Sequence, residues 1–231
     1  MPIKRHTSKI VDFFFPRSCV GCGKVGDFIC ARCRNSLPRL PDSVCARCGK
    51  PISGYDVCPS CRSSRASIDG IRSLFRFDGV IRKAIHAFKY SHVKALADPF
   101  AEYLYSYLLA HPLQGNVLVP VPLHPDRLRA RGYNQSALLA RRLSIHMNLP
   151  VIENCLIRAK NSIPQVQTTK GEERVQNVAD AFICRDRRLQ GKYVILVDDV
   201  CTTGSTLDAC AVALKTSDVS SIWGITIARE I

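Results

Sequence analysis

A run of thirteen residues, 194–206, constrains this chain of 231 residues more than any other stretch. It begins with four consecutive apolar residues, three of them β-branched, which predicts a strand covered on both faces in the middle of a parallel sheet. Asp198 and Asp199 follow this strand. A glycine among hydroxyl side chains comes next, in the order Thr202, Thr203, Gly204, Ser205 and Thr206. We expect Ser205 or Thr206 to cap the helix that continues from there.

This run predicts a site for a phosphorylated sugar. The start of a helix offers unpaired N–H groups and the positive end of the helix dipole, and Gly204 lets the backbone approach a phosphate closely. Asp198 and Asp199 would repel a phosphate, so they suit sugar hydroxyls or the water on a divalent cation. A buried strand that turns into a capped helix would need neither the paired acids nor four hydroxyls. The Gly-Lys-Ser/Thr of a Walker A loop is absent.

The same run resembles the phosphoribosyl pyrophosphate (PRPP) motif of type I phosphoribosyltransferases, in which two acidic residues precede a Thr-Thr-Gly-x-Thr loop. The resemblance implies a Rossmann-like α/β domain with a parallel sheet. It also implies that Asp198 and Asp199 are the catalytic acids, which engage the ribose hydroxyls directly or through hydrated Mg²⁺. Thr202–Thr206 would then hold the 5′-phosphate.

Cysteines dominate the first quarter of the chain. Eight of the twelve form four Cys-x-x-Cys pairs: Cys19, Cys22, Cys30, Cys33, Cys45, Cys48, Cys58 and Cys61. Two such pairs complete a tetrahedral Cys₄ site for Zn²⁺, whereas redox-active Cys-x-x-Cys chemistry usually needs one motif at a helix start. Sequential pairing predicts two zinc ions, although an interleaved cross-brace and a single ion stay open. We therefore expect a zinc-ribbon-like module over residues 1–66 and an α/β domain over 67–231, with the other cysteines in its core.

The charge of the chain is strongly basic, at +14. Residues 1–66 hold twelve Lys or Arg against four Asp, which favours a polyanionic partner such as single-stranded DNA. A solvated basic surface without a partner is the alternative. No apolar run approaches the ~20 residues of a membrane span, and residues 10–15 form a short apolar patch without a cleavage site. We expect this patch to pack on the next domain of a soluble cytoplasmic protein.

A second strand of the buried type, 116–121, runs into a loop with three prolines and three arginines. Ligands of an open parallel sheet gather at the carboxyl ends of its strands, so this loop should face the same cleft as Asp198. Arginine binds phosphate bidentately, which makes Arg127, Arg129 and Arg131 candidates for a pyrophosphate group. Arg129 and Arg131 could instead solvate a turn or contact a nucleic-acid backbone.

The sequence Pro-Val-Pro-Leu-His-Pro at 120–125, followed by Arg-Gly-Tyr-Asn-Gln at 131–135, resembles the ComF (ComFC/GntX) family. The resemblance extends from about Phe13 to the end. It implies a competence protein that binds PRPP with Mg²⁺ and single-stranded DNA during natural transformation. Such a protein would work in the cytoplasm or at the inner face of the membrane, with the DNA-uptake machinery or a helicase as partner. Leu123 to Arg127 would be the pyrophosphate loop, so the implied PRPP ligands include Leu123, His124, Arg127 and Arg131.

Further strands are expected over 71–77, 151–157, 181–183 and 222–228, and helices over 80–90, 99–110 and after Asn134. The polar segment 158–178 resembles the hood that type I enzymes close over their ligand, with a functionless surface loop as the alternative. Two other functions stay open. One is a stand-alone phosphoribosyltransferase for an unidentified base or amine, and the other is a zinc-bearing adaptor with a vestigial site.

Overall fold

The computed structural model describes residues 17–158, 182–184 and 186–231. Its centre is a four-stranded sheet in which every pair of neighbours is parallel, in the order β1–β6–β5–β2. The strands are β1 (Gly70–Arg76), β2 (Val117–Pro120), β5 (Tyr193–Cys201) and β6 (Ser221–Arg229). The parallel α/β sheet is confirmed, and β5 lies inside it, as its apolar run predicts.

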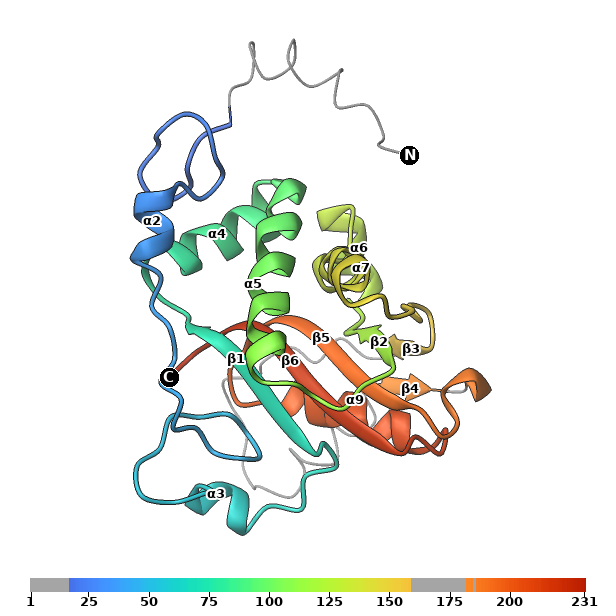
Figure 1. The fold of residues 1–231 in the computed structure, drawn as a ribbon. Helices are drawn as coiled ribbons and strands as arrows, with labels where there is room; N and C mark the ends of the chain where they lie inside the picture. Colours follow the sequence, from blue (N-terminus) through green and yellow to red (C-terminus); the bar gives the residue numbers. More distant parts are fainter. Residues whose placement is uncertain (1–16, 159–181, 185) are drawn as a thin grey trace, which may run out of the picture.

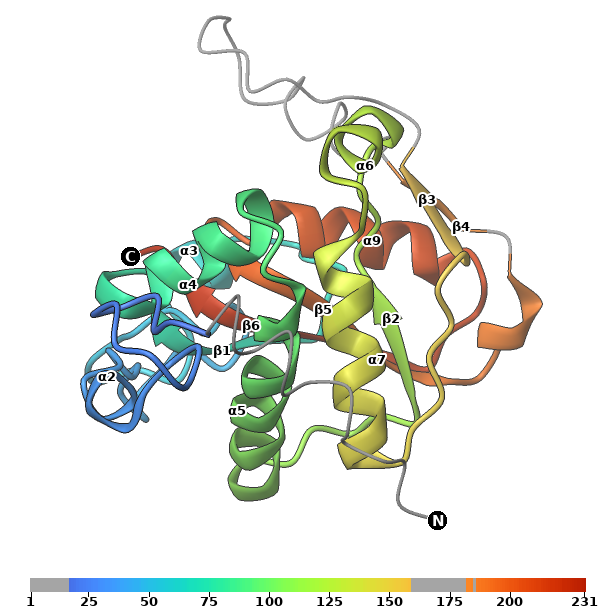
Figure 2. The same ribbon diagram turned by 90° about the horizontal axis from the view of Figure 1, so that it is seen from above.

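Helices cover both faces of the sheet (Figures 1 and 2). One face carries α4 (Gly79–Tyr90), α5 (Ala97–Ala110) and α7 (Gln135–Met147), and the other carries α9 (Ser205–Lys215). Alternate residues of β5 point to opposite faces, so Ile195 and Val197 pack with the first group while Val194 and Leu196 pack with α9. Within the described part of the chain, no helix is long and apolar enough to cross a membrane.

The strand expected over 151–157 is wrong for most of its length. Val151 makes an isolated bridge to Leu118, and β3 covers only Leu156–Arg158, paired antiparallel with β4 (Phe182–Cys184). Glu153 interrupts the apolar pattern and turns outward to form an ion pair with Arg141. The predicted hood beyond Arg158 and the apolar patch 10–15 lie outside the described residues.

The cysteine-rich module lies along the β1 edge of the sheet, with α2 (Ala31–Asn35) beside α4 and α3 (Pro59–Arg62) at the opposite end (Figure 1). The segment between the two halves extends the sheet, because Leu40 N–H donates to Leu74 O and Arg76 N–H donates to Pro38 O. The boundary at residue 66 stays a prediction. The stretch 62–70 is tied to α9 through Asp208, which accepts hydrogen bonds from two of its backbone N–H groups.

Candidate functional site

The two acids lie at the carboxyl end of β5, beside the loop that follows β2. Val121 N–H donates to Val197 O over 3.0 Å, so the backbone pairing of the two strands continues into this loop. Asn134 caps α7, and its Nδ2 donates to Val121 O. Ser136, in the first turn of α7, donates its hydroxyl to Asp198 Oδ1 over 2.8 Å. The start of α7 therefore joins the loop after β2 to the acids after β5.

Asp199 is only 2% exposed and pairs with a lysine from another helix. Lys89 Nζ, on α4, lies 2.7 Å from Asp199 Oδ1. The second oxygen, Oδ2, is buried without a hydrogen-bond partner among the described residues. Buried polar atoms are almost always hydrogen-bonded, so this oxygen fits a polar ligand group, a water molecule or a cation.

Asp198 is half-buried and lies next to a second carboxylate, that of Asp199. Burial and the adjacent Asp199 carboxylate raise the pKa of Asp198 to about 7, against the opposing effects of Lys89 and of the hydrogen bonds from Ser136 and the Asp199 N–H. Near neutral pH a proton therefore competes for this carboxylate with any cation or sugar hydroxyl that binds it.

The raised pKa predicts a pH-dependent stability. The folded chain binds the Asp198 proton more tightly than the unfolded chain, so stability is lost as pH rises from the ordinary aspartate range towards 7. We expect Asp198→Asn to raise Tm at pH 8 by several degrees and to leave it nearly unchanged at pH 4.5, in thermal unfolding followed by circular dichroism. An equal change in Tm at both pH values would contradict the raised pKa.

Residues 202–206 form the loop that is predicted to hold a phosphate, called the phosphate loop below. Its structure differs from the prediction in one respect. Gly204, rather than Ser205 or Thr206, occupies the N-cap position of α9. Its φ is +90°, and a Cβ there would lie 2.8 Å from Ile71 Cδ1, so both the backbone conformation and the packing favour glycine. Thr203 Oγ1 accepts from Ser205 N–H, and the two hydroxyls lie 2.7 Å apart. Thr202, Thr203 and Ser205 are exposed, so their hydroxyls face solvent at the start of α9.

The residues expected to bind pyrophosphate lie in and directly before a short helix, α6 (Pro125–Arg131). Its N-cap His124 accepts from Asp126 N–H through Nδ1, and Leu123 and His124 are half-buried. Arg127 is exposed on α6. Arg131 binds Gln135 Oε1 and lies over the ring of Tyr90 at 5.2 Å. Arg129 instead pairs with Asp126 at the surface.

Arg158, on β3, adds a fourth arginine to Arg127, Arg129 and Arg131, and these four are called the arginine rim below. Burial first, and then the nearby charge of Arg127, lower the pKa of Arg158. The charge of Arg127 acts on Arg158, and together with Lys89 and Arg131 these groups favour an anionic ligand. The sequence predicted no role for Lys89 or Ser136, because both lie on helices whose pattern indicates ordinary packing.

The cysteines form two separate Cys₄ groups, as sequential pairing predicts. Cys19, Cys22, Cys30 and Cys33 make one group and Cys45, Cys48, Cys58 and Cys61 the other, and the sulfur atoms of each group lie within 4.8 Å of one another. Backbone N–H groups donate to the first sulfur of each set. Burial raises the pKa of Cys19 and of Cys45, but the hydrogen bonds outweigh burial and lower both pKa values to about 6. This suits thiolate ligands of zinc. The other four cysteines are buried, as expected.

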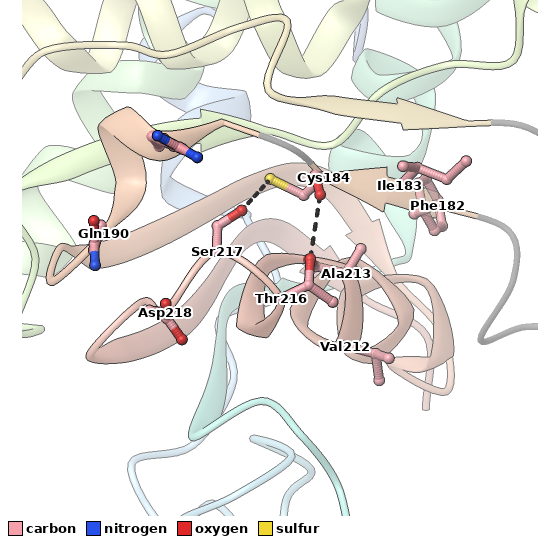
Figure 3. A pocket seen from close by; sticks show the side chains of 10 residues that line it. Phe182, Ile183, Cys184, Gln190, Val212, Ala213, Thr216, Ser217 and Asp218 are labelled. Carbon is pink, nitrogen blue, oxygen red and sulfur yellow. Dashed lines mark hydrogen bonds between the residues drawn. The ribbon is translucent and has the colours of Figure 1, made fainter.

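A cavity of about 980 Å³ lies between β4 and the C-terminal half of α9 (Figure 3). Thr216 donates to Cys184 O and Ser217 donates to Cys184 Sγ, and these bonds hold β4 against the end of α9. This cavity lies at the opposite end of α9 from the phosphate loop, and neither acid lines it.

Comparisons with known proteins agree with this two-part organisation. Residues 10–62 match the double zinc ribbon domain and residues 132–230 match the phosphoribosyl transferase domain. The chain is 28% identical to competence protein ComFC of Bacillus subtilis, over 90% of this chain and 86% of that protein. It is 29% identical to competence protein F of Haemophilus influenzae, over 86% and 96%. DNA utilization protein YhgH of Escherichia coli is 29% identical over 60% of this chain and 62% of its own length. The chain therefore resembles the ComF competence proteins over most of its length and joins a double zinc ribbon to a type I phosphoribosyltransferase fold.

Proposed function

We propose that this protein binds PRPP together with Mg²⁺ at the carboxyl ends of β2 and β5. The observation that carries the proposal is the Oδ2 atom of Asp199, buried without a partner among the described residues, beside a hydroxyl-lined helix start. A ribose hydroxyl or water on Mg²⁺ would satisfy this oxygen. The match of residues 132–230 to the phosphoribosyl transferase domain supports the same ligand class.

Each part of PRPP has a counterpart in the site. The 5′-phosphate would accept from the N–H groups at the start of α9 and from the hydroxyls of residues 202–206. Asp198 and Asp199 would engage the ribose hydroxyls or the hydrated Mg²⁺, and the pyrophosphate would meet Leu123, His124, Arg127 and Arg131. In this arrangement Lys89 holds the Asp199 carboxylate in place through their contact at 2.7 Å.

Transfer would follow the chemistry of PRPP. A nucleophile attacks C1 of the ribose and pyrophosphate leaves, so the charge of the leaving group must be stabilised by the arginine rim and Mg²⁺. The acids would position the ribose and stabilise the positive charge that develops on it, rather than serve as a dedicated base. The acceptor stays open, and a vestigial site that binds without transfer is the alternative.

The direct test is isothermal titration of the purified zinc-loaded chain with PRPP. We expect one PRPP per chain and binding that requires Mg²⁺, with ribose 5-phosphate and pyrophosphate each binding more weakly than the whole ligand. Saturable binding of pyrophosphate alone, with no gain from the ribose, would contradict the assignment of the acids. A pyrophosphate-release assay with a panel of bases and amines then separates a transferase from a binding protein.

A second role, in DNA uptake during competence, is favoured by the surface of the ribbons and by the names of the relatives. Between residues 17 and 66, nine Lys or Arg stand against three Asp, and Arg32, Arg34 and Arg62 are exposed. A zinc ion held by four thiolates carries a net negative charge, which lowers the net positive charge of the module. A polyanion would therefore bind to these exposed arginines and not respond to the overall charge of the module. We propose that single-stranded DNA binds here, in the cytoplasm or at the inner face of the membrane, near an uptake machinery or helicase.

Salt dependence tests this second role. We expect the affinity for a fluorescent single-stranded oligonucleotide, followed by anisotropy, to fall steeply with salt, because phosphate contacts release counterions. Arg32→Glu/Arg34→Glu should reduce the slope of log K against log salt by about 2 and weaken binding roughly uniformly across sequences. Arg187→Glu/Lys215→Glu, the same charge change at the far end of α9, serves as the control. Equal effects of the two double variants would remove the ribbons as the binding surface.

A further inference from the structure

Arg229, at the end of β6, is a buried cation without a carboxylate partner. It is 3% exposed, and within the described ranges no acidic side chain pairs with it. Its Nη1 donates to Cys48 O over 2.6 Å and to Cys201 Sγ over 3.0 Å, while Nε is buried without a partner. A buried charge normally costs several kcal/mol unless an opposite charge compensates it. The counter-charge of Arg229 must therefore come from a group other than Asp or Glu.

The second Cys₄ group supplies that charge when it holds zinc. Four thiolates outweigh one divalent ion, so the loaded site is negative, and Cys48 contributes both a ligand sulfur and the carbonyl that Arg229 binds. Cys201, the other partner of Arg229, is also affected by the charge of Cys48. Burial raises its pKa to about 11, Arg229 opposes this effect, and Asp198 and Cys48 add to it.

Arg229 also contacts the residue directly before the phosphate loop. Its partner Cys201 is the last residue of β5, directly before Thr202. Arg229 and Cys201 face each other in the β5–β6 register. Glu230 N–H donates to Cys201 O over 3.0 Å, so the end of β5 is held by both the backbone and the side chain of the β6 terminus.

A second connection joins the same zinc knuckle to the same loop. Ile71 N–H donates to Arg47 O over 2.7 Å, and a Cβ on Gly49 would overlap the Ile71 carbonyl. On its other side, the Ile71 side chain lies against Gly204 and would meet any Cβ there. The knuckle 45–49 thus supports the phosphate loop in two ways, at Cys201 directly before it through Arg229, and at Gly204 within it through Ile71. The first Cys₄ group lies instead against α4, where Lys83 Nζ donates to Gly21 O.

We propose that Arg229 is a positioning residue through which the zinc site of Cys45, Cys48, Cys58 and Cys61 holds the phosphate loop in its binding geometry, so that zinc occupancy there and ligand affinity are coupled. The ligand side of this inference rests on the proposed PRPP function. The zinc side does not, because Arg229 stabilises the negative zinc site whether or not a ligand binds.

The test uses two matched single-site zinc variants, Cys48→Ser for the second site and Cys22→Ser for the first. Both remove the second ligand of a knuckle. In calorimetric titrations with Mg²⁺ and PRPP, we expect Cys48→Ser to weaken binding at least tenfold and Cys22→Ser to change it less than threefold. Arg229→Met should weaken binding about as much as Cys48→Ser. The double variant Cys48→Ser/Arg229→Met should bind only slightly more weakly than either single variant. Arg229→Lys should bind more tightly than Arg229→Met.

Zinc release supplies a readout that a merely structural role would not move. Coupling is reciprocal, so saturating Mg²⁺ and PRPP should slow zinc transfer to a chromophoric chelator from Cys22→Ser, which keeps the second site, and not from Cys48→Ser. Arg229→Met should speed release from the second site even without ligand. If wild-type protein binds no PRPP yet this acceleration appears, the proposed function fails and the role of Arg229 stands. Equal ligand affinities of the two cysteine variants, or zinc release that ignores Arg229, would overturn the inference.

Discussion

Asp198→Asn/Asp199→Asn is expected to raise the Kd for Mg²⁺ and PRPP at least 100-fold. The two carboxylates are the site's acidic groups at the end of β5, and Asp199 offers a buried oxygen without a partner among the described residues. Hydrogen bonds to charged groups contribute about 1.5–3 kcal/mol each, so losing two such interactions corresponds to roughly two to four orders of magnitude in affinity. Isothermal titration of the folded variant measures the loss.

Asparagine keeps the shape of the side chains, and Asp218→Asn supplies the same chemical change at the far end of α9. Asp218 has a positive φ that asparagine also adopts readily, so we expect this control to fold and to bind PRPP like the wild type. Wild-type affinity in the double variant, with an unchanged zinc content, would show that the acids do not contact the ligand and would end the case for a PRPP site at β5.

Purified protein is expected to contain two zinc ions per chain and to lose the fold of residues 17–66 when both are removed. In the first ribbon, three of the buried residues are zinc ligands themselves, and only Ile29 and Leu37 add apolar side chains. The second ribbon buries Cys45 and Cys58 and no large apolar residue. Structural zinc contributes roughly 10–16 kcal/mol in small zinc-binding peptides, far more than these few contacts. Limited proteolysis after chelation should therefore cut first within residues 17–66.

Single substitutions make the zinc prediction site-specific. Cys33→Ser and Cys58→Ser should each lower the content from two ions to one, because each removes a ligand from a different Cys₄ group. Cys155→Ala, at a buried cysteine outside both groups, should leave two ions bound. A wild-type content of one ion, or loss of both ions from either ligand variant, would contradict two independent sites.

Local patterns were sufficient to predict most elements of the fold. The apolar run 194–197 predicted the central strand because a strand buried on both faces needs apolar residues at consecutive positions. Four Cys-x-x-Cys pairs predicted two zinc sites because each pair brings two thiolates together within one tight turn. Asn134 was likewise predictable as a cap, since its side chain bonds the backbone two residues ahead.

Predictions failed where a contact with a residue apart in sequence decided the local conformation. Ser205 and Thr206 are good caps in general, yet Gly204 takes the position because the loop must pass Ile71 without a side chain. The strand expected at 151–157 was shortened because Glu153 pairs with Arg141 on α7. In both cases a residue distant in sequence set the local conformation.

The sequence by itself determined the chemistry of the site, that is, which carboxylates, hydroxyls and thiolates the chain offers and at which strand and helix ends they stand. Only the tertiary structure decided which charges compensate them. Lys89 reaches Asp199 from α4, Ser136 reaches Asp198 from α7, and Arg229 joins Cys48 to Cys201 across 181 and 28 residues of chain. Local sequence carries no record of such pairs, because the strand order and the helices packed on each face bring them together.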